Sequence, residues 1–198
     1  MSSRSTFAFF KPFGVLCQFS PKPGKTTLGQ YLDVPKDVYP VGRLDEDSEG
    51  LLILTNDKRL NTALLRPSSQ IVKTYLALVE GIPEERVLKR LREGVLIKIK
   101  NRGPYLTAPC EAEIVAPPEW LPQRVPPPVL RRQKRYCWLQ LRLTEGKNRQ
   151  VRRMTAALGH PTLRLVRTAI GALELKGMAP GQWQALSDSQ IRLLFCRP

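Results

Sequence analysis

The chain has 198 residues, of which 42% are hydrophobic, and it carries 32 Lys and Arg residues against 17 Asp and Glu residues. The net charge of +15 at pH 7 exceeds what solubility requires and predicts a polyanionic partner, although a merely basic protein is the alternative. Nucleic acid is favoured over a membrane, because the positive charge is spread along the chain and no run of about 18 apolar residues occurs.

Short β-branched, aromatic or leucine-rich runs bounded by turn residues predict nine strands. In chain order they cover residues 7–10, 50–55, 74–79, 95–99, 110–115, 136–143, 163–166, 172–175 and 182–185. Four helices are predicted at residues 58–65, 84–93, 148–158 and 188–195. Clustered strands with scattered helices predict an α+β fold with a mainly antiparallel mixed sheet, formed by a single domain, residues 1–198, in two lobes.

Residues 116–135 differ in composition from the rest of the chain. They contain three consecutive prolines at 126–128, followed by a basic cluster at 131–135. Because proline-rich segments stay extended and a basic cluster is solvated, we predict an exposed loop. It either becomes ordered on RNA or serves as a passive linker.

Cysteine and histidine usage excludes several kinds of site. The four cysteines are far apart and form no C-x-x-C pair, which predicts free thiols rather than zinc ligands or disulfides. The only histidine, His160, excludes a multi-histidine metal site and is expected in a loop after a helix. The N-terminal apolar run is shorter than the signal-peptide core of about 7 to 15 residues, so we expect a cytoplasmic protein.

An acidic loop at residues 45–50 directly precedes the apolar run at 51–54. Its spacing resembles the start of a calcium-binding loop, but the twelfth position, which should be a bidentate Glu, is Asn56. We therefore predict no metal site. A pair of carboxylates for glycosidic hydrolysis is a further alternative.

Asp45 is the carboxylate of this loop that we select as the reactive group. Asp47 and Glu49 are interpreted as solvated turn residues beside a serine and a glycine. Asp45 differs because it follows Leu44, whose side chain can anchor inward while the carboxylate is presented in a cleft.

The predicted helix at 148–158 contains three arginines with different exposures. Its core-facing stripe, at spacing i, i+3, i+4 and i+7, consists of Val151, Met154, Thr155 and Leu158. Arg152 lies about 100° around the helix from Val151, at the border between core and solvent, and can reach into a cleft. Arg149 and Arg153 point farther out, as phosphate contacts or as a solvated face.

Five motifs follow one another along the chain. They are Lys-Pro-Phe-Gly at 11–14, Gly-Arg-Leu-Asp with its acidic loop and strand at 42–57, Lys-Thr-Tyr at 73–75, Glu-Gly-Lys-Asn-Arg-Gln-Val-Arg-Arg-Met at 145–154 and Leu-Val-Arg-Thr-Ala-Ile-Gly at 165–171. In order, spacing and identity they resemble the ribosomal RNA pseudouridine synthases of the small-subunit synthase A type. Many members carry an N-terminal S4 RNA-binding domain; we expect this chain to lack it, like compact members that act on 23S rRNA.

The resemblance implies a pseudouridine synthase fold with a central catalytic cleft. It implies that Asp45 is the catalytic aspartate, Tyr75 the active-site tyrosine, Arg152 the basic partner and Leu165 the apolar wall. The reaction detaches uracil from ribose C1′ and rejoins it through C5. The carboxylate can attack C1′, attack C6 of the base or withdraw the C2′ proton, and all three routes stay open. No metal or organic cofactor is expected, because the isomerisation is redox-neutral and adds no atoms.

Each supporting residue has a physical role in this interpretation. Tyr75 follows Lys73 by two residues, so both side chains face the same way on a strand. We expect the tyrosine ring to stack on the flipped uracil, with a core tyrosine as the alternative. Leu165 is otherwise an ordinary core leucine. Arg152 is expected to hold the Asp45 carboxylate and to keep it charged when RNA excludes water.

A basic surface around the cleft is expected to bind RNA with marked salt dependence. Its candidate residues are Lys11, Arg43, Lys73, Lys147, Arg149, Arg153 and Arg167. The expected partner of this monomer is 23S rRNA or a large-subunit assembly intermediate. Two other functions remain open, namely a non-catalytic rRNA-binding or ribosome-assembly protein and an enzyme that removes uracil by hydrolysis.

Overall fold

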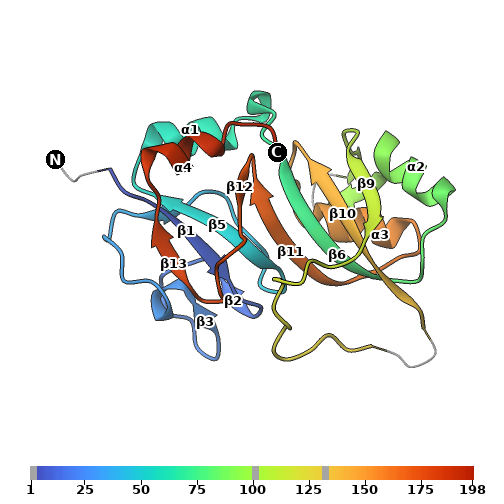
Figure 1. Ribbon diagram of the computed structural model, residues 1–198, viewed down its shortest axis with the longest axis horizontal. Helices are drawn as coiled ribbons and strands as arrows, with labels where there is room; N and C mark the ends of the chain where they lie inside the picture. Colours follow the sequence, from blue (N-terminus) through green and yellow to red (C-terminus); the bar gives the residue numbers. More distant parts are fainter. Residues whose placement is uncertain (1–3, 100–102, 131–133) are drawn as a thin grey trace. The chain divides into compact units, whose positions relative to one another are not determined.

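The computed structural model describes residues 4–99, 103–130 and 134–198 (Figure 1). The chain forms two compact units. Unit 1 consists of Met1–Ile71 and Arg167–Pro198, and unit 2 is the continuous stretch Val72–Val166. Part of the predicted basic cluster, residues 131–133, lies outside the described residues.

Unit 1 is built on the strand order β13-β1-β5-β11, with β4 beside β5 and β12 beside β11. The strands are β1 (Thr6–Lys11), β4 (Tyr39–Pro40), β5 (Glu49–Thr55), β11 (Thr162–Ile170), which continues from unit 2, β12 (Leu173–Glu174) and β13 (Trp183–Ala185). β1 and β5 are antiparallel in the register Thr6↔Thr55 to Lys11↔Gly50. Every residue of both strands is buried, which fits their nearly unbroken apolar sequences.

The remaining elements of unit 1 are short. They are β2 (Val15–Leu16), β3 (Thr26–Thr27), the 3-10 helices η1 (Leu28–Gln30) and η2 (Pro67–Ser69), and the helices α1 (Lys58–Leu65) and α4 (Asp188–Leu193). α1 begins where the Asp57 carboxylate accepts hydrogen bonds from two first-turn amides, and α4 begins with a Ser187–Gln190 capping box.

Unit 2 has the strand order β11-β6-β10-β9 and a separate β7–β8 hairpin. Its elements are β6 (Lys73–Glu80), α2 (Glu85–Glu93), β7 (Leu96–Ile99), β8 (Gly103–Leu106), β9 (Glu111–Val115), β10 (Tyr136–Leu143) and α3 (Gln150–Ala157). One buried cluster joins both helices to the strands and includes Leu91, Leu139 and Met154. Both helices therefore pack on the same face of β6 and β10 (Figure 1).

These elements confirm the predicted α+β class with a mixed, mainly antiparallel sheet. All nine predicted strands and four predicted helices are present, with ends that shift by a few residues. The strand predicted at 163–166 extends over Thr162–Ile170, and the helix predicted from 148 begins at Gln150. Strands β2, β3, β4 and β8 were not predicted.

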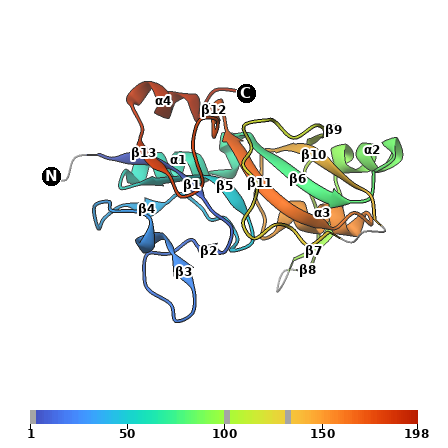
Figure 2. The ribbon, with the colours of Figure 1, turned by 60° about the horizontal axis from the view of Figure 1, so that its bottom comes forward.

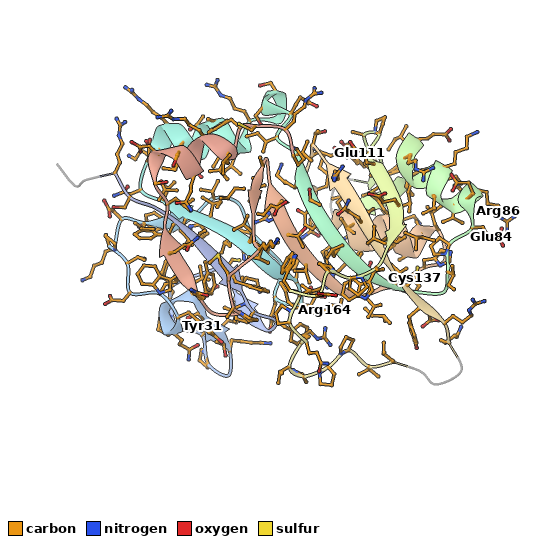
Figure 3. The ribbon with its side chains drawn as sticks, viewed as in Figure 1. Tyr31, Glu84, Arg86, Glu111, Cys137 and Arg164 are labelled. Carbon is orange, nitrogen blue, oxygen red and sulfur yellow. The ribbon has the colours of Figure 1, made fainter. Side chains whose placement is uncertain are left out.

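The described part of the proline-rich segment, residues 116–130, contains no helix or strand, as predicted. Its first half is attached to unit 2. Arg164, labelled in Figure 3, donates to the Pro122 carbonyl at 2.9 Å and lies 5.8 Å from the centre of the Trp138 ring. Arg124 donates to the Leu163 carbonyl at 3.4 Å. Beyond these contacts Val129 is 86% exposed, so the loop is fixed at its base and open to solvent farther along.

The predictions that the cysteines are free thiols and that His160 follows a helix end are confirmed. All four cysteines are free thiols. His160 follows the end of α3, where its backbone N–H donates to the Thr155 carbonyl and its Nδ1 lies 2.9 Å from the Glu80 carbonyl. Among the described residues, no helix combines the length and hydropathy needed to cross a membrane.

Candidate active site

Asp45 lies in the loop between β4 and β5 of unit 1, and its side chain is half-buried. Leu44 before it is only 7% exposed, and its N–H donates to the Cys17 sulfur at 3.3 Å. The Ser48 N–H donates to the Asp45 carbonyl at 3.1 Å and closes the turn. The predicted inward anchor at Leu44 is therefore confirmed, and it fixes the backbone that carries the carboxylate.

Lys11 holds the other side of this loop. Its side chain is fully buried, and its ammonium donates to the carbonyls of Pro12 at 2.9 Å, Val15 at 2.7 Å and Glu46 at 3.4 Å. The Gly14 N–H donates to the same Glu46 carbonyl at 2.8 Å. All three ammonium protons are thus used inside unit 1, which contradicts the predicted contact of Lys11 with RNA and makes it a structural residue.

The electrostatics of Lys11 reflect both its burial and the acidic loop. Burial lowers the pKa of Lys11 from 10.5 to about 8, while the charges of Cys17, Glu49, Asp47 and Asp45 oppose this shift. Near neutral pH the ammonium therefore keeps its proton and attracts the carboxylates of the loop. A buried cation beneath the candidate catalytic loop was not predicted.

Two further residues of unit 1 differ from their predicted roles. Glu49 is only 3% exposed and is the first residue of β5, so its interpretation as a solvated turn residue is wrong. Arg167 is 5% exposed, and its Nε donates to the Leu51 carbonyl at 2.8 Å, which contradicts its predicted role on an RNA-binding surface. A Cβ at Gly50 (φ +108°) would lie 2.2 Å from the Arg167 carbonyl oxygen, so this close crossing of β5 and β11 requires glycine.

Tyr75 and Leu165 belong to the core of unit 2. Tyr75 lies opposite Leu141 on β10, is half-buried and packs against the buried cluster that contains Leu165. Lys73 starts β6 on the same face and is also half-buried. Because both Tyr75 and Leu165 have core contacts, their predicted roles against the base stay predictions.

The three arginines near α3 occupy different positions. Arg149 is the N-cap residue in the left-handed region (φ +53°), not part of the helix as predicted. Arg152 is half-buried and donates to the Thr162 carbonyl at 3.0 Å, while the predicted stripe residues Val151 and Met154 are buried. Arg153 donates to carbonyls of Asn148 and Lys98, which joins α3 to β7.

Glu145 is the centre of a hydrogen-bond network that the sequence did not reveal. Its carboxylate accepts from the Tyr105 hydroxyl at 2.5 Å, the Ala108 N–H at 2.9 Å and the Gln150 amide at 2.6 Å. The hydrogen bond from the Tyr105 hydroxyl to Glu145 raises the pKa of Tyr105. The Lys147 ammonium lies 4.8 Å from the centre of the same tyrosine ring. The network connects the segment before α3 to the β8–β9 connection, and only the Glu145–Gln150 spacing is visible in the sequence.

The candidate residues are therefore divided between the two units. Asp45 and the exposed Arg43 belong to unit 1, and the other candidates that the structure leaves partly accessible belong to unit 2. Within residues 4–99, 103–130 and 134–198 there is no group of three His, Cys, Asp or Glu side chains suited to hold a metal ion.

Comparisons with known proteins agree with one another. The family model described as RNA pseudouridylate synthase matches residues 5–157. Proteins named ribosomal large subunit pseudouridine synthase E are 44% identical in Vibrio parahaemolyticus, over 94% of this chain and 75% of the relative, and 49% identical in Xanthomonas axonopodis pv. citri, over 92% of this chain and 94% of the relative. A solved structure titled pseudouridylate synthase superposes with a TM-score of 0.79 at 28% identity, covering 98% of this chain and 75% of that one.

Proposed function

The chain belongs to the RNA pseudouridylate synthase family and is a pseudouridine synthase, and we propose that Asp45 is the carboxylate with which it isomerises one uridine of 23S rRNA. The large-subunit substrate is supported by the names of relatives that are 44% and 49% identical to this chain over the aligned residues. We further propose that it acts in the cytoplasm, as a monomer, on free rRNA or on an assembly intermediate.

The observation that carries the assignment of Asp45 is the construction of its loop. Leu44 on one side is buried, and the Glu46 carbonyl on the other side accepts from Lys11 and Gly14. The backbone is thus fixed on both sides of a half-buried carboxylate. A negative charge on an RNA-binding protein lowers its affinity for phosphates. A carboxylate that is nevertheless held in place in so basic a chain therefore supports a role for Asp45 in the reaction rather than in binding.

The other roles in the proposal follow from the family resemblance. The target uridine is flipped out of its helix or loop, and the Tyr75 ring and Leu165 side chain contact the base. Arg152 keeps Asp45 ionised when bound RNA excludes water, because an opposite charge favours the carboxylate over the neutral acid. The partly accessible basic residues contact flanking phosphates, which makes binding sensitive to salt.

Tritium release from rRNA labelled at uridine C5 tests the proposal, because C5 loses its hydrogen when it bonds to ribose. We expect Asp45→Asn to abolish release while its rRNA affinity stays within a few-fold of wild type. The matched control is Asp47→Asn, which removes the same charge from the same loop and should retain release.

Three outcomes contradict parts of this proposal. Continued release by Asp45→Asn refutes the role of Asp45. Tight rRNA binding by the wild-type protein without release on any rRNA form favours the non-catalytic binding protein. Free uracil among the products, in place of pseudouridine, favours hydrolysis.

A further inference from the structure

The loop between β2 and β3, together with η1, forms a groove in unit 1 that none of the predicted site residues lines. Its volume is about 620 Å³, and the residues that matter for its chemistry are Phe19, Lys22, Lys25, Thr26 and Gln30. Figure 2 shows this loop extending away from the sheet of unit 1. A volume in this range accommodates a small organic ligand such as a nucleotide.

Backbone hydrogen bonds hold the groove in shape without a ligand. β2 and β3 pair in parallel, and the Leu28 N–H donates to the Gln18 carbonyl at 2.9 Å. The Gln30 side chain accepts from the Thr27 N–H at 2.9 Å. A Cβ at Gly29 would lie 2.9 Å from the Phe19 carbonyl oxygen, so glycine permits this close packing. The groove is therefore preformed rather than created by binding.

Two lysines stand close together on this loop. Lys22 and Lys25 form an isolated β-bridge, in which the Lys25 N–H donates to the Lys22 carbonyl at 3.1 Å, across a turn with Gly24 at φ +67°. The residues lining the groove include both lysines and no carboxylate. Although the Lys25 ammonium also pairs with Glu46, the two lysines make this lining attractive to anions such as the phosphates of a nucleic acid.

Phe19 adds an aromatic side chain to this basic lining, and it is half-buried. Basic side chains next to an exposed aromatic face are the combination with which proteins bind single-stranded nucleic acid, because every base can stack on a ring. We propose that the groove binds an unpaired nucleotide of the RNA substrate, with its phosphates at Lys22 and Lys25 and its base against Phe19.

An ion pair connects the groove to the candidate catalytic loop. The Lys25 ammonium lies 2.7 Å from the Glu46 carboxylate, and the two side chains are 42% and 38% exposed. A pair this exposed is screened by solvent and salt, so a phosphate can replace the carboxylate at little cost. Because Glu46 directly follows Asp45, RNA held in the groove is anchored on the unit that carries the catalytic carboxylate. The identity of the ligand as substrate RNA rests on the proposed function.

Fluorescence anisotropy of a fluorescein-labelled, single-stranded decauridylate measures binding to the full chain. The double variant Lys22→Ala/Lys25→Ala should bind about tenfold more weakly near 0.15 M salt, and the slope of log K against log salt should fall by about 1.4, or 0.7 for each lost phosphate contact. The matched control, Lys36→Ala/Lys58→Ala, removes the same charge from exposed positions of unit 1 and should change affinity by less than threefold.

Two further comparisons separate ligand contact from a purely structural role. Phe19→Leu should weaken decauridylate binding at least fivefold and leave binding of an RNA duplex unchanged, while Phe19→Tyr, which keeps a ring, should restore affinity. Lys25→Ala should weaken binding, whereas Glu46→Gln, which breaks the same ion pair but keeps the lysine, should not.

The proposal is overturned if the two double variants bind alike, if Phe19→Leu matches wild type, if Lys25→Ala and Glu46→Gln have the same effect, or if the wild-type protein does not bind the decauridylate. None of these measurements needs turnover. If the protein releases tritium but the groove variants bind decauridylate like wild type, only the groove proposal is refuted. If the groove variants bind more weakly as expected but the wild-type protein releases no tritium, only the proposed reaction is refuted.

Discussion

Replacing Glu145 with alanine should destabilise unit 2, because three donors lose their shared acceptor. The carboxylate accepts from Tyr105 at 2.5 Å, Gln150 at 2.6 Å and Ala108 at 2.9 Å. A hydrogen bond to a charged group contributes about 1.5–3 kcal/mol when it is well shielded. Glu145 is half-buried, so water can replace part of each bond, and the net value of about 1 kcal/mol for an ordinary hydrogen bond applies.

The sum for Glu145→Ala is about 3 kcal/mol of unfolding free energy, taking about 1 kcal/mol for each lost bond. In a chain of this length each kcal/mol corresponds to a shift of about 2–4 °C in the midpoint of thermal unfolding, so we expect a decrease of roughly 6–12 °C. Tyr105→Phe, which removes one donor, should cost about 1 kcal/mol. The double variant should cost about 1 kcal/mol less than the two single changes added together, because both remove the same bond.

Urea denaturation combined with hydrogen exchange at the buried amides of β10 measures this effect in unit 2 itself, without assuming that both units unfold together. The matched control is Glu119→Ala, which removes an exposed carboxylate from the same unit. If Glu145→Ala and Glu119→Ala unfold at the same urea concentration, the network does not stabilise unit 2 and the reasoning is refuted.

Two other predictions concern unit 1. Gly50→Ala should lower the free energy of unfolding by more than about 3 kcal/mol, because its Cβ would meet the Arg167 carbonyl oxygen at 2.2 Å. The control is Gly146→Ala in unit 2, which has nothing within 4 Å and should lower it by less than about 1 kcal/mol; equal thermal midpoints contradict this. For Lys11, whose pKa of about 8 lies below the ordinary 10.5, the unfolded chain binds more protons than the folded chain above pH 8, so unfolding free energy should rise with pH by up to about 1.4 kcal/mol per unit. Burial raises the pKa of Cys110 from 9.0 to about 11, so above pH 9 this thiol makes the free energy of unfolding fall with pH. Urea titrations from pH 7.5 to 9 should show this rise in the wild-type protein and not in Lys11→Met. If the unfolding free energies of the two proteins change with pH in parallel, Lys11 is not the cause.

Local signals in the sequence were enough for the regular elements. Helix α1 and strand β10 were both predicted with their observed ends, and in the structure the Asp57 carboxylate caps α1. The two-residue strands β2, β3 and β4 carry no such signal, and β8 contains Pro104, which is unusual in a strand. Their pairing depends on the tertiary structure around them.

The candidate site was predicted less completely than the fold. The anchoring role of Leu44 could be inferred because an apolar residue beside an acidic loop turns inward. Lys11 and Arg167 were placed on the surface because charged side chains are rarely buried, yet both are buried and donate to backbone carbonyls. The partners of Glu145 lie as far as 40 residues away in the sequence, so its role becomes visible only in three dimensions.

The division of the chain affects the order in which its units can form during synthesis. Unit 2 is continuous and is complete once residue 166 has left the ribosome. Unit 1 contains strand β1, which pairs with β13 at residues 183–185, so it has to wait until these residues have been synthesised. Although domains usually fold from the N-terminus onward during translation, here the later segment can mature first. The apolar strands β1 and β5 then stay incompletely covered until β13 has been synthesised, and chaperones that bind extended apolar chain can act on them during this interval.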